Sequence, residues 1–239
     1  MKKYIVAGLL YSLSILAQAS VSGVALDSID VDASNKESLQ NGAVIYMDYC
    51  MSCHSLEYAR YNRVARDLEI EENEFVERFI HTGAKFGELM ENAIPEKQAK
   101  SWFGSAPPDL TLVSKLRSPE WLYSYLRGFY ADDSRPWGVN NVIFKDVGMP
   151  HVLLQLQGLC AVEPSIGHGE TLCEEYASEG SMSAEEYDAA TYDLVNFLAY
   201  MADPSKLERE RLGWMVFLFL GIFFVVSWLY TRELHKDIH

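Results

Sequence analysis

Two cysteines and one histidine stand together in the motif Cys50-Met51-Ser52-Cys53-His54. Two thiols three positions apart can form thioether bonds to both vinyl groups of a haem, and the histidine that follows can ligate the iron. A thioredoxin-like redox pair shares this spacing, but no βαβ pattern surrounds it. A zinc site would need further ligands, and the chain has no second Cys-x-x-Cys motif. The motif therefore predicts one covalent haem c, attached at Cys50 and Cys53 with His54 as an axial ligand.

A second axial ligand must come from elsewhere, and methionine or histidine is the usual choice. Met149 lies between Gly148 and Pro150, in a segment that proline keeps extended, so that one side chain can be aimed at a metal. His151 is a nearby competitor. Methionines often simply fill a hydrophobic core. Among the other candidates, Met90 fits a loop, Met182 a position before a helix cap and Met201 a helix face. The local pattern favours Met149 and leaves His151 open.

Apolar residues at helical spacing lead into the motif, at Leu39, Ala43, Tyr46 and Met47. This periodicity predicts an amphipathic helix that delivers Cys50 to the haem edge.

Two further helices have recognisable starts. Ser183 and Glu186 form a capping box, and the helix that it opens ends before Pro204. Ser118 precedes a proline at the first position of another helix, which Gly128 ends. We find no alternation long enough for a substantial sheet. The predicted fold class is mainly α, a c-type cytochrome domain of helices and long loops around one haem.

Both ends of the chain are apolar. Residues 1–19 have two lysines, an uncharged run and the small-x-small ending Ala17-Gln18-Ala19, which is typical of a secretory signal peptide cleaved after Ala19. Residues 212–231 contain no charged residue. Twenty residues in a helix span about 30 Å, the thickness of the hydrocarbon core of a bilayer. We therefore expect a single C-terminal transmembrane anchor.

The orientation follows from the signal, because basic residues flank the anchor on both sides. An exported chain would place residues 20–211 in the periplasm of a bacterial cell, with 212–231 crossing the inner membrane. The tail, residues 232–239, would remain in the cytoplasm.

Acidic residues dominate the composition, and the formal net charge of −14 becomes −16 when the two lysines of the signal are removed. This balance argues against a protein that follows nucleic-acid phosphates. The acidic groups either serve solubility or steer a basic protein partner.

Cys160 and Cys173 are left once the haem motif has taken the other two cysteines. In an oxidising compartment such a pair is expected to form a disulfide. The twelve residues between them include Pro164, Gly167 and Gly169, so this loop can turn back on itself. Two buried free cysteines are the alternative.

A family resemblance extends over nearly all of the chain that follows the signal. Residues 39–43, 49–55 and 61–68 resemble the haem-attachment region of the cytochrome c1 family, whose members are the haem c subunits of the ubiquinol–cytochrome c reductase (cytochrome bc1) complex. Residues 106–111, Ala-Pro-Pro-Asp-Leu-Thr, are similar to a Pro-Pro-Asp-Leu-Ser stretch of that family. Residues 148–158 are similar to the segment that carries the second axial ligand in proteobacterial members.

The resemblance implies a set of roles for individual residues. It makes Met149 the second axial ligand, Arg117 the partner of a haem propionate and Pro108 part of the haem pocket. It also implies that the haem accepts electrons from a Rieske iron–sulfur subunit and passes them to a soluble c-type cytochrome, beside a cytochrome b subunit. Enzymatic activity would then belong to the complex, as a quinol–cytochrome c oxidoreductase.

Two other functions are compatible with a single haem on a membrane anchor. One is an anchored haem c enzyme, such as a peroxidase or an oxidase subunit, which needs an open iron position. The other is a stand-alone tethered electron carrier.

Overall fold

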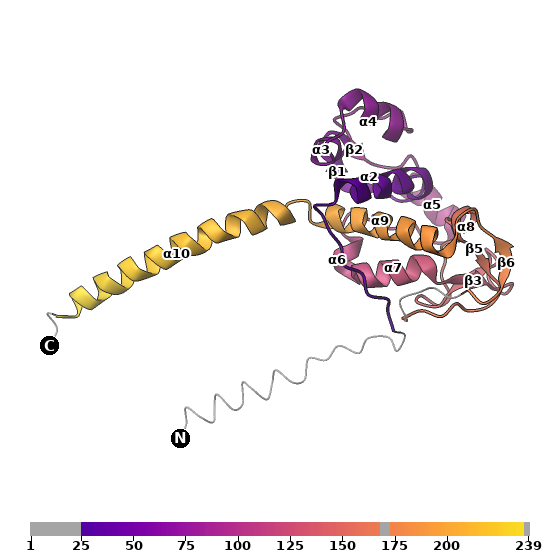
Figure 1. Cartoon of the computed structure of the whole chain (residues 1–239). Coiled ribbons are helices and arrows are strands. Elements are labelled where there is room, and N and C mark those ends of the chain that lie inside the picture. Colours follow the sequence, from indigo (N-terminus) through magenta and orange to yellow (C-terminus); the bar gives the residue numbers. More distant parts are fainter. Residues whose placement is uncertain (1–24, 168–172, 237–239) are drawn as a thin grey trace, which may run out of the picture.

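The computed structural model describes residues 25–167 and 173–236, so the signal peptide expected over 1–19 lies outside the described residues, as does the very end of the tail. Helices make up about half of the described residues (Figure 1). The helices are α2 (Lys36–Ile45), η1 (Tyr46–Cys50), α3 (Tyr61–Asp67), α4 (Glu72–Phe79), α5 (Glu96–Phe103), α6 (Val113–Arg117), α7 (Pro119–Arg127), α8 (Leu154–Gln157), α9 (Ala184–Ala202) and α10 (Lys206–Leu234). The strands are β1 (Leu56–Arg60), β2 (Leu89–Met90), β3 (Phe129–Ala131), β4 (Val139–Asn141), β5 (Gly158–Cys160) and β6 (Tyr176–Glu179).

Local capping explains where the two predicted helices begin. The Ser183 hydroxyl accepts from the backbone N–H of Glu186, whose side chain accepts in turn from the Ser183 N–H, so the capping box at the start of α9 is confirmed. At α7 the Ser118 hydroxyl accepts from the N–H of Trp121, and Pro119 occupies the first turn. The predicted helix that leads to Cys50 is also present, but its last five residues widen into the π-helical turn η1.

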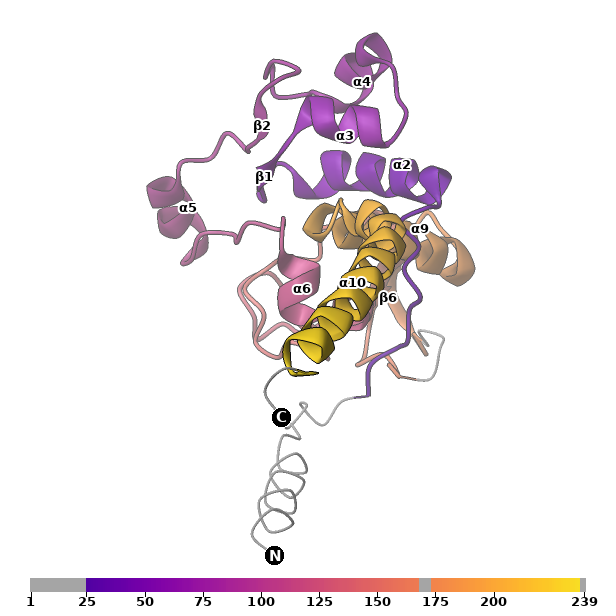
Figure 2. The same cartoon turned by 90° about the vertical axis from the view of Figure 1, so that its left-hand side faces the viewer.

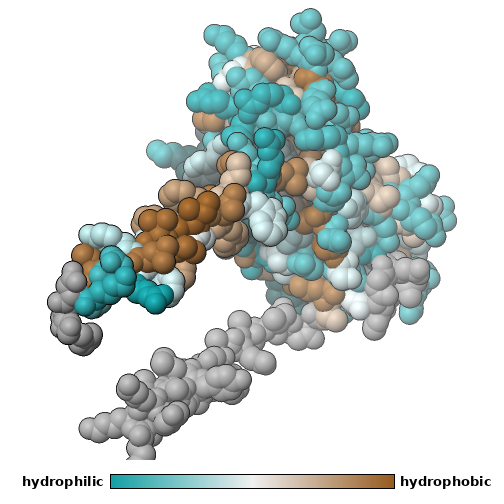
Figure 3. All heavy atoms as spheres, turned by 60° about the vertical axis from the view of Figure 1, so that its left-hand side comes forward, coloured by the Kyte–Doolittle hydropathy of each residue, from teal (hydrophilic) through white to brown (hydrophobic). Residues whose placement is uncertain are grey.

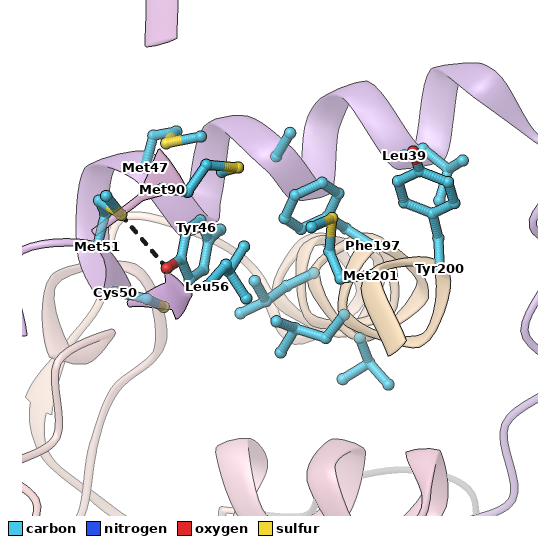
Figure 4. Close-up of a cluster of buried hydrophobic side chains, with 14 of the residues drawn as sticks. Leu39, Tyr46, Met47, Cys50, Met51, Leu56, Met90, Phe197, Tyr200 and Met201 are labelled. Atoms are coloured by element: carbon cyan, nitrogen blue, oxygen red, sulfur yellow. Dashed lines mark hydrogen bonds between the residues drawn. The ribbon is translucent and has the colours of Figure 1, made fainter. Parts of the chain in front are cut away.

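Helices α2 and α9 pack side by side at the centre of the domain (Figure 1). Gly42 makes this close crossing possible, because a β-carbon at that position would lie 2.0 Å from the backbone oxygen of Asp193. The Tyr46 ring lies 5.8 Å from the ring of Phe197 across the same contact. Figure 4 shows these side chains in the apolar cluster that the two helices share with Leu39, Met90 and Met201. The core thus begins directly beside the Cys-x-x-Cys motif.

Within the described residues, the strands form two small sheets. Strands β1 and β2 form an antiparallel pair, and the larger sheet has the order β4-β3-β5-β6, in which β3 and β5 run parallel. Every strand has five residues or fewer, which agrees with the absence of long alternation in the sequence. The larger sheet lies near the N-terminal end of α9, which is the end distant from α10 (Figure 1). The segment that carries Met149 connects two of its strands, β4 and β5.

A buried ion cluster joins three distant parts of the chain. Arg127, at the end of α7, is fully buried; its Nε and Nη2 donate to the two carboxylate oxygens of Asp188 on α9 at 2.7 and 2.9 Å. Its Nη1 donates to Asp27 in the N-terminal segment at 3.0 Å. Because both carboxylates meet the guanidinium with good geometry, the cluster fixes how these segments sit against each other.

Helix α10 leads away from the domain and is exposed along its length (Figures 1 and 2). Hydrophobic side chains cover its middle, as the brown atoms in Figure 3 show. Its length and composition are those of a membrane-spanning helix. The helix has 29 residues and therefore extends beyond the predicted span 212–231 on both sides. A mainly helical domain with one apolar C-terminal helix is confirmed.

Candidate functional site

The haem motif sits where the first core helix ends. Cys50 is buried at the last position of η1, and Cys53 is half-buried. The N–H groups of Cys53 and His54 both donate to the carbonyl oxygen of Cys50, at 3.1 and 2.8 Å, so the motif forms a tight turn. Neither cysteine is in a disulfide. Burial, with a smaller contribution from Cys53, raises the pKa of the Cys50 thiol to about 12.

The imidazole of His54 is oriented by the backbone of Pro108. Its Nδ1 lies 2.7 Å from the Pro108 carbonyl oxygen, and a carbonyl can only accept, so Nδ1 carries the proton and Nε2 keeps a free lone pair. Burial lowers the pKa of His54, although the Pro108 carbonyl and the charge of Asp109 oppose that shift. A neutral imidazole held through Nδ1 is the form that ligates a metal through Nε2.

Neighbouring hydrogen bonds hold this turn in place. Asp109 accepts from the N–H of Glu57 at 2.7 Å, and the N–H of Leu110 donates to the Ser55 carbonyl at 3.0 Å. Asn92 donates to the Cys53 carbonyl through its side chain at 2.8 Å. The segment around residues 106–111 is therefore fastened to the haem motif, and it presents the Pro108 carbonyl to His54.

Tyr46 contacts the motif from the hydrophobic core. Its hydroxyl lies 2.6 Å from the His54 carbonyl oxygen, to which it donates, and 3.3 Å from the Met51 sulfur (Figure 4). The buried core side of the motif is thereby tied to η1.

Met149 lies at a bend between β4 and β5, not in the extended stretch expected from the sequence, and packs, partly buried, against the hydrophobic core. Its Sδ accepts a hydrogen bond of 3.4 Å from the hydroxyl of Tyr125 on α7. A thioether sulfur has a second lone pair, so this contact leaves it able to bind a metal. The Met149 sulfur thus accepts one hydrogen bond from Tyr125 and keeps one lone pair that could bind a metal.

His151 is committed elsewhere. Its Nε2 lies 3.1 Å from the carbonyl of Gly158, and its ring stacks on Phe129 with centroids 4.7 Å apart. Burial lowers the pKa of His151 to about 4. Because one ring nitrogen is engaged with the backbone and the ring stacks on Phe129 of β3, His151 is less free than Met149 to bind a metal.

The structure places Arg117 and Pro108 near the surface. The Arg117 guanidinium is exposed and lies over the Trp121 ring, 5.1 Å from its centroid. The Pro108 side chain is exposed too, and the direct contribution of this residue is its carbonyl group.

Cys160 and Cys173 form a disulfide in the structure, with their Cα atoms 5.4 Å apart. The bridge joins the end of β5 to the segment before β6. It lies across the loop that follows the Met149 segment.

The donor set fits a covalent haem. A haem c with histidine and methionine ligation requires two thiols, an imidazole and a thioether. The chain supplies all of them, and the Nδ1 of the imidazole is already hydrogen-bonded. A family model described as the cytochrome C1 family matches residues 83–238. The chain belongs to the cytochrome c1 family.

Curated relatives extend the match over the haem motif. Cytochrome c1 of Allochromatium vinosum is 46% identical over the whole of both chains. A protein of Nitrosomonas europaea named ammonia monooxygenase gamma subunit is 42% identical over 94% of this chain and 93% of its own length. A cytochrome b/c1 of Bradyrhizobium diazoefficiens is 26% identical over 86% of this chain and 34% of its own length.

Membership of the cytochrome c1 family defines the general role of the chain. It carries one covalently bound haem c and is a membrane-anchored electron-transfer subunit of a cytochrome bc1 complex. The resemblance that we noted in the sequence is confirmed.

Some contacts of the site were missed by sequence reasoning. Tyr125, Asn92 and Tyr46 were not selected as functional residues, although each touches the motif or the candidate ligand. Tyr125 lies four positions after Trp121, so these two residues share one face of α7, but nothing in the sequence pairs Tyr125 with Met149. Asn92 carried no such signal, since it reaches the motif from a loop.

Proposed function

We propose that this chain holds its haem c through Cys50 and Cys53, with His54 and Met149 as axial ligands, and that the haem passes electrons from a Rieske iron–sulfur protein to a soluble c-type cytochrome. The observation that carries the proposal is the hydrogen bond between His54 Nδ1 and the Pro108 carbonyl oxygen, 2.7 Å long. It leaves Nε2 as a metal-binding lone pair directly beside two free thiols.

The residues around the haem would set its reduction potential for electron transfer. A bound haem supplies a reversible one-electron change at iron. The Met149 thioether favours the ferrous state more than a second histidine would. The apolar core around Cys50 lowers the local dielectric, which disfavours the more positively charged ferric state. Arg117 pairs with a haem propionate, since its guanidinium is exposed at the end of α6 and held over Trp121.

The topology follows from the apolar ends of the chain. Residues 1–19 direct export and are removed, residues 20–211 form the periplasmic haem domain, residues 212–231 span the inner membrane and residues 232–239 stay in the cytoplasm. Support comes from the exposed apolar helix α10 at the C-terminal end. The Bradyrhizobium relative is named for cytochrome b as well as c1 and matches over 34% of its length, which supports a cytochrome b subunit as the partner in the membrane.

The test is purification of the chain from its native membrane. We expect cytochrome b and Rieske subunits to co-purify, with haem b and haem c in the absorption spectrum, and quinol to reduce the haem c. Carbon monoxide should not bind the ferrous protein, because both axial positions are filled. Co-purification with monooxygenase subunits, or a haem that binds carbon monoxide readily, would instead indicate an anchored haem enzyme. Isolation without any partner would indicate a stand-alone carrier.

A further inference from the structure

The hydroxyl of Tyr125 is directed at the sulfur of Met149 from a helix that carries neither haem motif nor ligand. The donor and acceptor atoms are 3.4 Å apart, within the range for a bond to sulfur. Tyr125 lies near the end of α7 and Met149 lies 24 positions later. The contact is therefore tertiary and depends on how α7 packs against the Met149 segment.

Two aromatic rings hold the Tyr125 ring. Trp121 stacks on it with the centroids 4.8 Å apart and an angle of 10° between the planes. Phe129 meets it edge-on at 5.3 Å. The Tyr125 carbonyl also accepts from the Asn141 side chain at 2.7 Å. With the ring and the backbone fixed in this way, the hydroxyl has little freedom to point elsewhere.

The stack continues toward the candidate propionate partner. Arg117 lies over the other aromatic ring of the pair, with its Cζ 5.1 Å from the Trp121 centroid. Trp121 and Tyr125 are four residues apart and share one face of α7, and Arg117 reaches the Trp121 ring from the end of α6. A single row of side chains thus connects the proposed propionate contact to the proposed axial ligand.

We propose that Tyr125 is a positioning residue for Met149, whose hydrogen bond to Sδ fixes the orientation of the thioether and raises the reduction potential of the haem. The proposal rests on the proposed ligation by Met149. A hydrogen bond to one sulfur lone pair withdraws electron density from the sulfur. The remaining lone pair would then donate less electron density to ferric iron than the lone pair of a thioether without this hydrogen bond. The ferrous state would therefore be relatively favoured.

The experiment is a redox titration of haem c in the intact complex carrying Tyr125→Phe. This change removes the hydroxyl and keeps the ring that stacks on Trp121. We expect haem to remain attached and the potential to shift to more negative values. The weak red absorption band of methionine-ligated ferric haem should also move, which a merely structural loss would not cause while the ligand stays bound.

Tyr123→Phe is the matched control. Tyr123 lies on the same helix, and its ring packs against Arg127 at 4.3 Å, away from the Met149 sulfur. We expect the potential to stay at the wild-type value. An unchanged potential in Tyr125→Phe would overturn the proposal, and so would an equal shift in Tyr123→Phe.

Two further variants separate the possible failures. Trp121→Leu keeps the Tyr125 hydroxyl but releases the Tyr125 ring, and we expect the reduction potential to shift in the same direction. If Tyr125→Phe does not accumulate, an unchanged potential in Trp121→Leu overturns the proposal.

Met149→Leu tests the underlying ligation. A changed potential in Met149→Leu with none in Tyr125→Phe would reject only the role of Tyr125, whereas no change in Met149→Leu would reject the ligand assignment itself.

Discussion

His54 and Pro108 are 54 residues apart in sequence, yet the ring Nδ1 of one lies 2.7 Å from the carbonyl oxygen of the other. A proline cannot donate through its backbone, but its carbonyl is an acceptor like any other. The pairing selects one tautomer of the imidazole and one ring orientation. The Asp109 carboxylate, which accepts from the Glu57 N–H, and the Leu110 N–H, which donates to the Ser55 carbonyl, keep the two segments from separating.

Replacing Cys50 with serine should remove one thioether bond while Cys53 retains the other. The pyridine haemochrome band should then move from the position of a two-thioether haem c, because one vinyl group remains unsaturated. Cys53→Ser is expected to produce a similar shift. An unaltered band in Cys50→Ser would exclude the attachment that we assign to this residue.

Met149→Leu should keep the haem attached but open one axial position. The potential should fall markedly, carbon monoxide should bind the ferrous protein, and quinol-driven reduction should slow. Met182→Leu is a suitable control, since Met182 is partly buried against the same core. Normal behaviour of Met149→Leu would direct attention to His151 or to another methionine.

The disulfide between Cys160 and Cys173 closes a loop with a sequence separation of 13. In the chain-entropy description such a bridge contributes roughly 3 kcal/mol to the free energy of unfolding. Cys160→Ser together with Cys173→Ser should lower that free energy by a comparable amount and loosen the segment after Met149. Mass spectrometry of the non-reduced, alkylated protein checks the bridge directly, because alkylation of both thiols would contradict it.

Arg127→Met should destabilise the domain strongly. The side chain keeps much of its volume, but the carboxylates of Asp188 and Asp27 lose the guanidinium that they share. Breaking a buried pair in this way costs about 3–5 kcal/mol. Arg66→Met removes an exposed pair with Asp67 and should cost less than about 1 kcal/mol. Chemical denaturation of the detergent-solubilised holoprotein compares the two, and equal losses would contradict the role of the cluster.

Acidification should weaken the fold through His151. Burial lowers the pKa of His151 from 6.5 to about 4 in the folded chain, so below neutral pH the unfolded chain binds more protons. The associated stability is complete above about pH 6.5 and is lost as the pH falls toward 4, by at most about 3 kcal/mol. His151→Gln should flatten this dependence of the unfolding free energy.

The elements with local signals could be predicted from the sequence. The Ser183 capping box, the start of α7 at Pro119 and the apolar C-terminal helix each depend on residues a few positions apart. The site motif is local as well. What could not be predicted is tertiary: strands of two to five residues carry too little alternation to recognise, and no pattern near Met149 points to Tyr125. The widening of α2 into η1 also has no signature in residues 46–50.

The crossing of α2 and α9 has a consequence for the order of maturation. Asn41 and Asp193 meet there although 152 positions separate them, and contacts between such distant residues form slowly because a long loop must close. Synthesis proceeds from the N-terminus, so the two thiols are made long before the helix that completes the core around Cys50. The attachment motif is therefore synthesised first, and α9 packs against α2 and the Tyr46 ring afterwards.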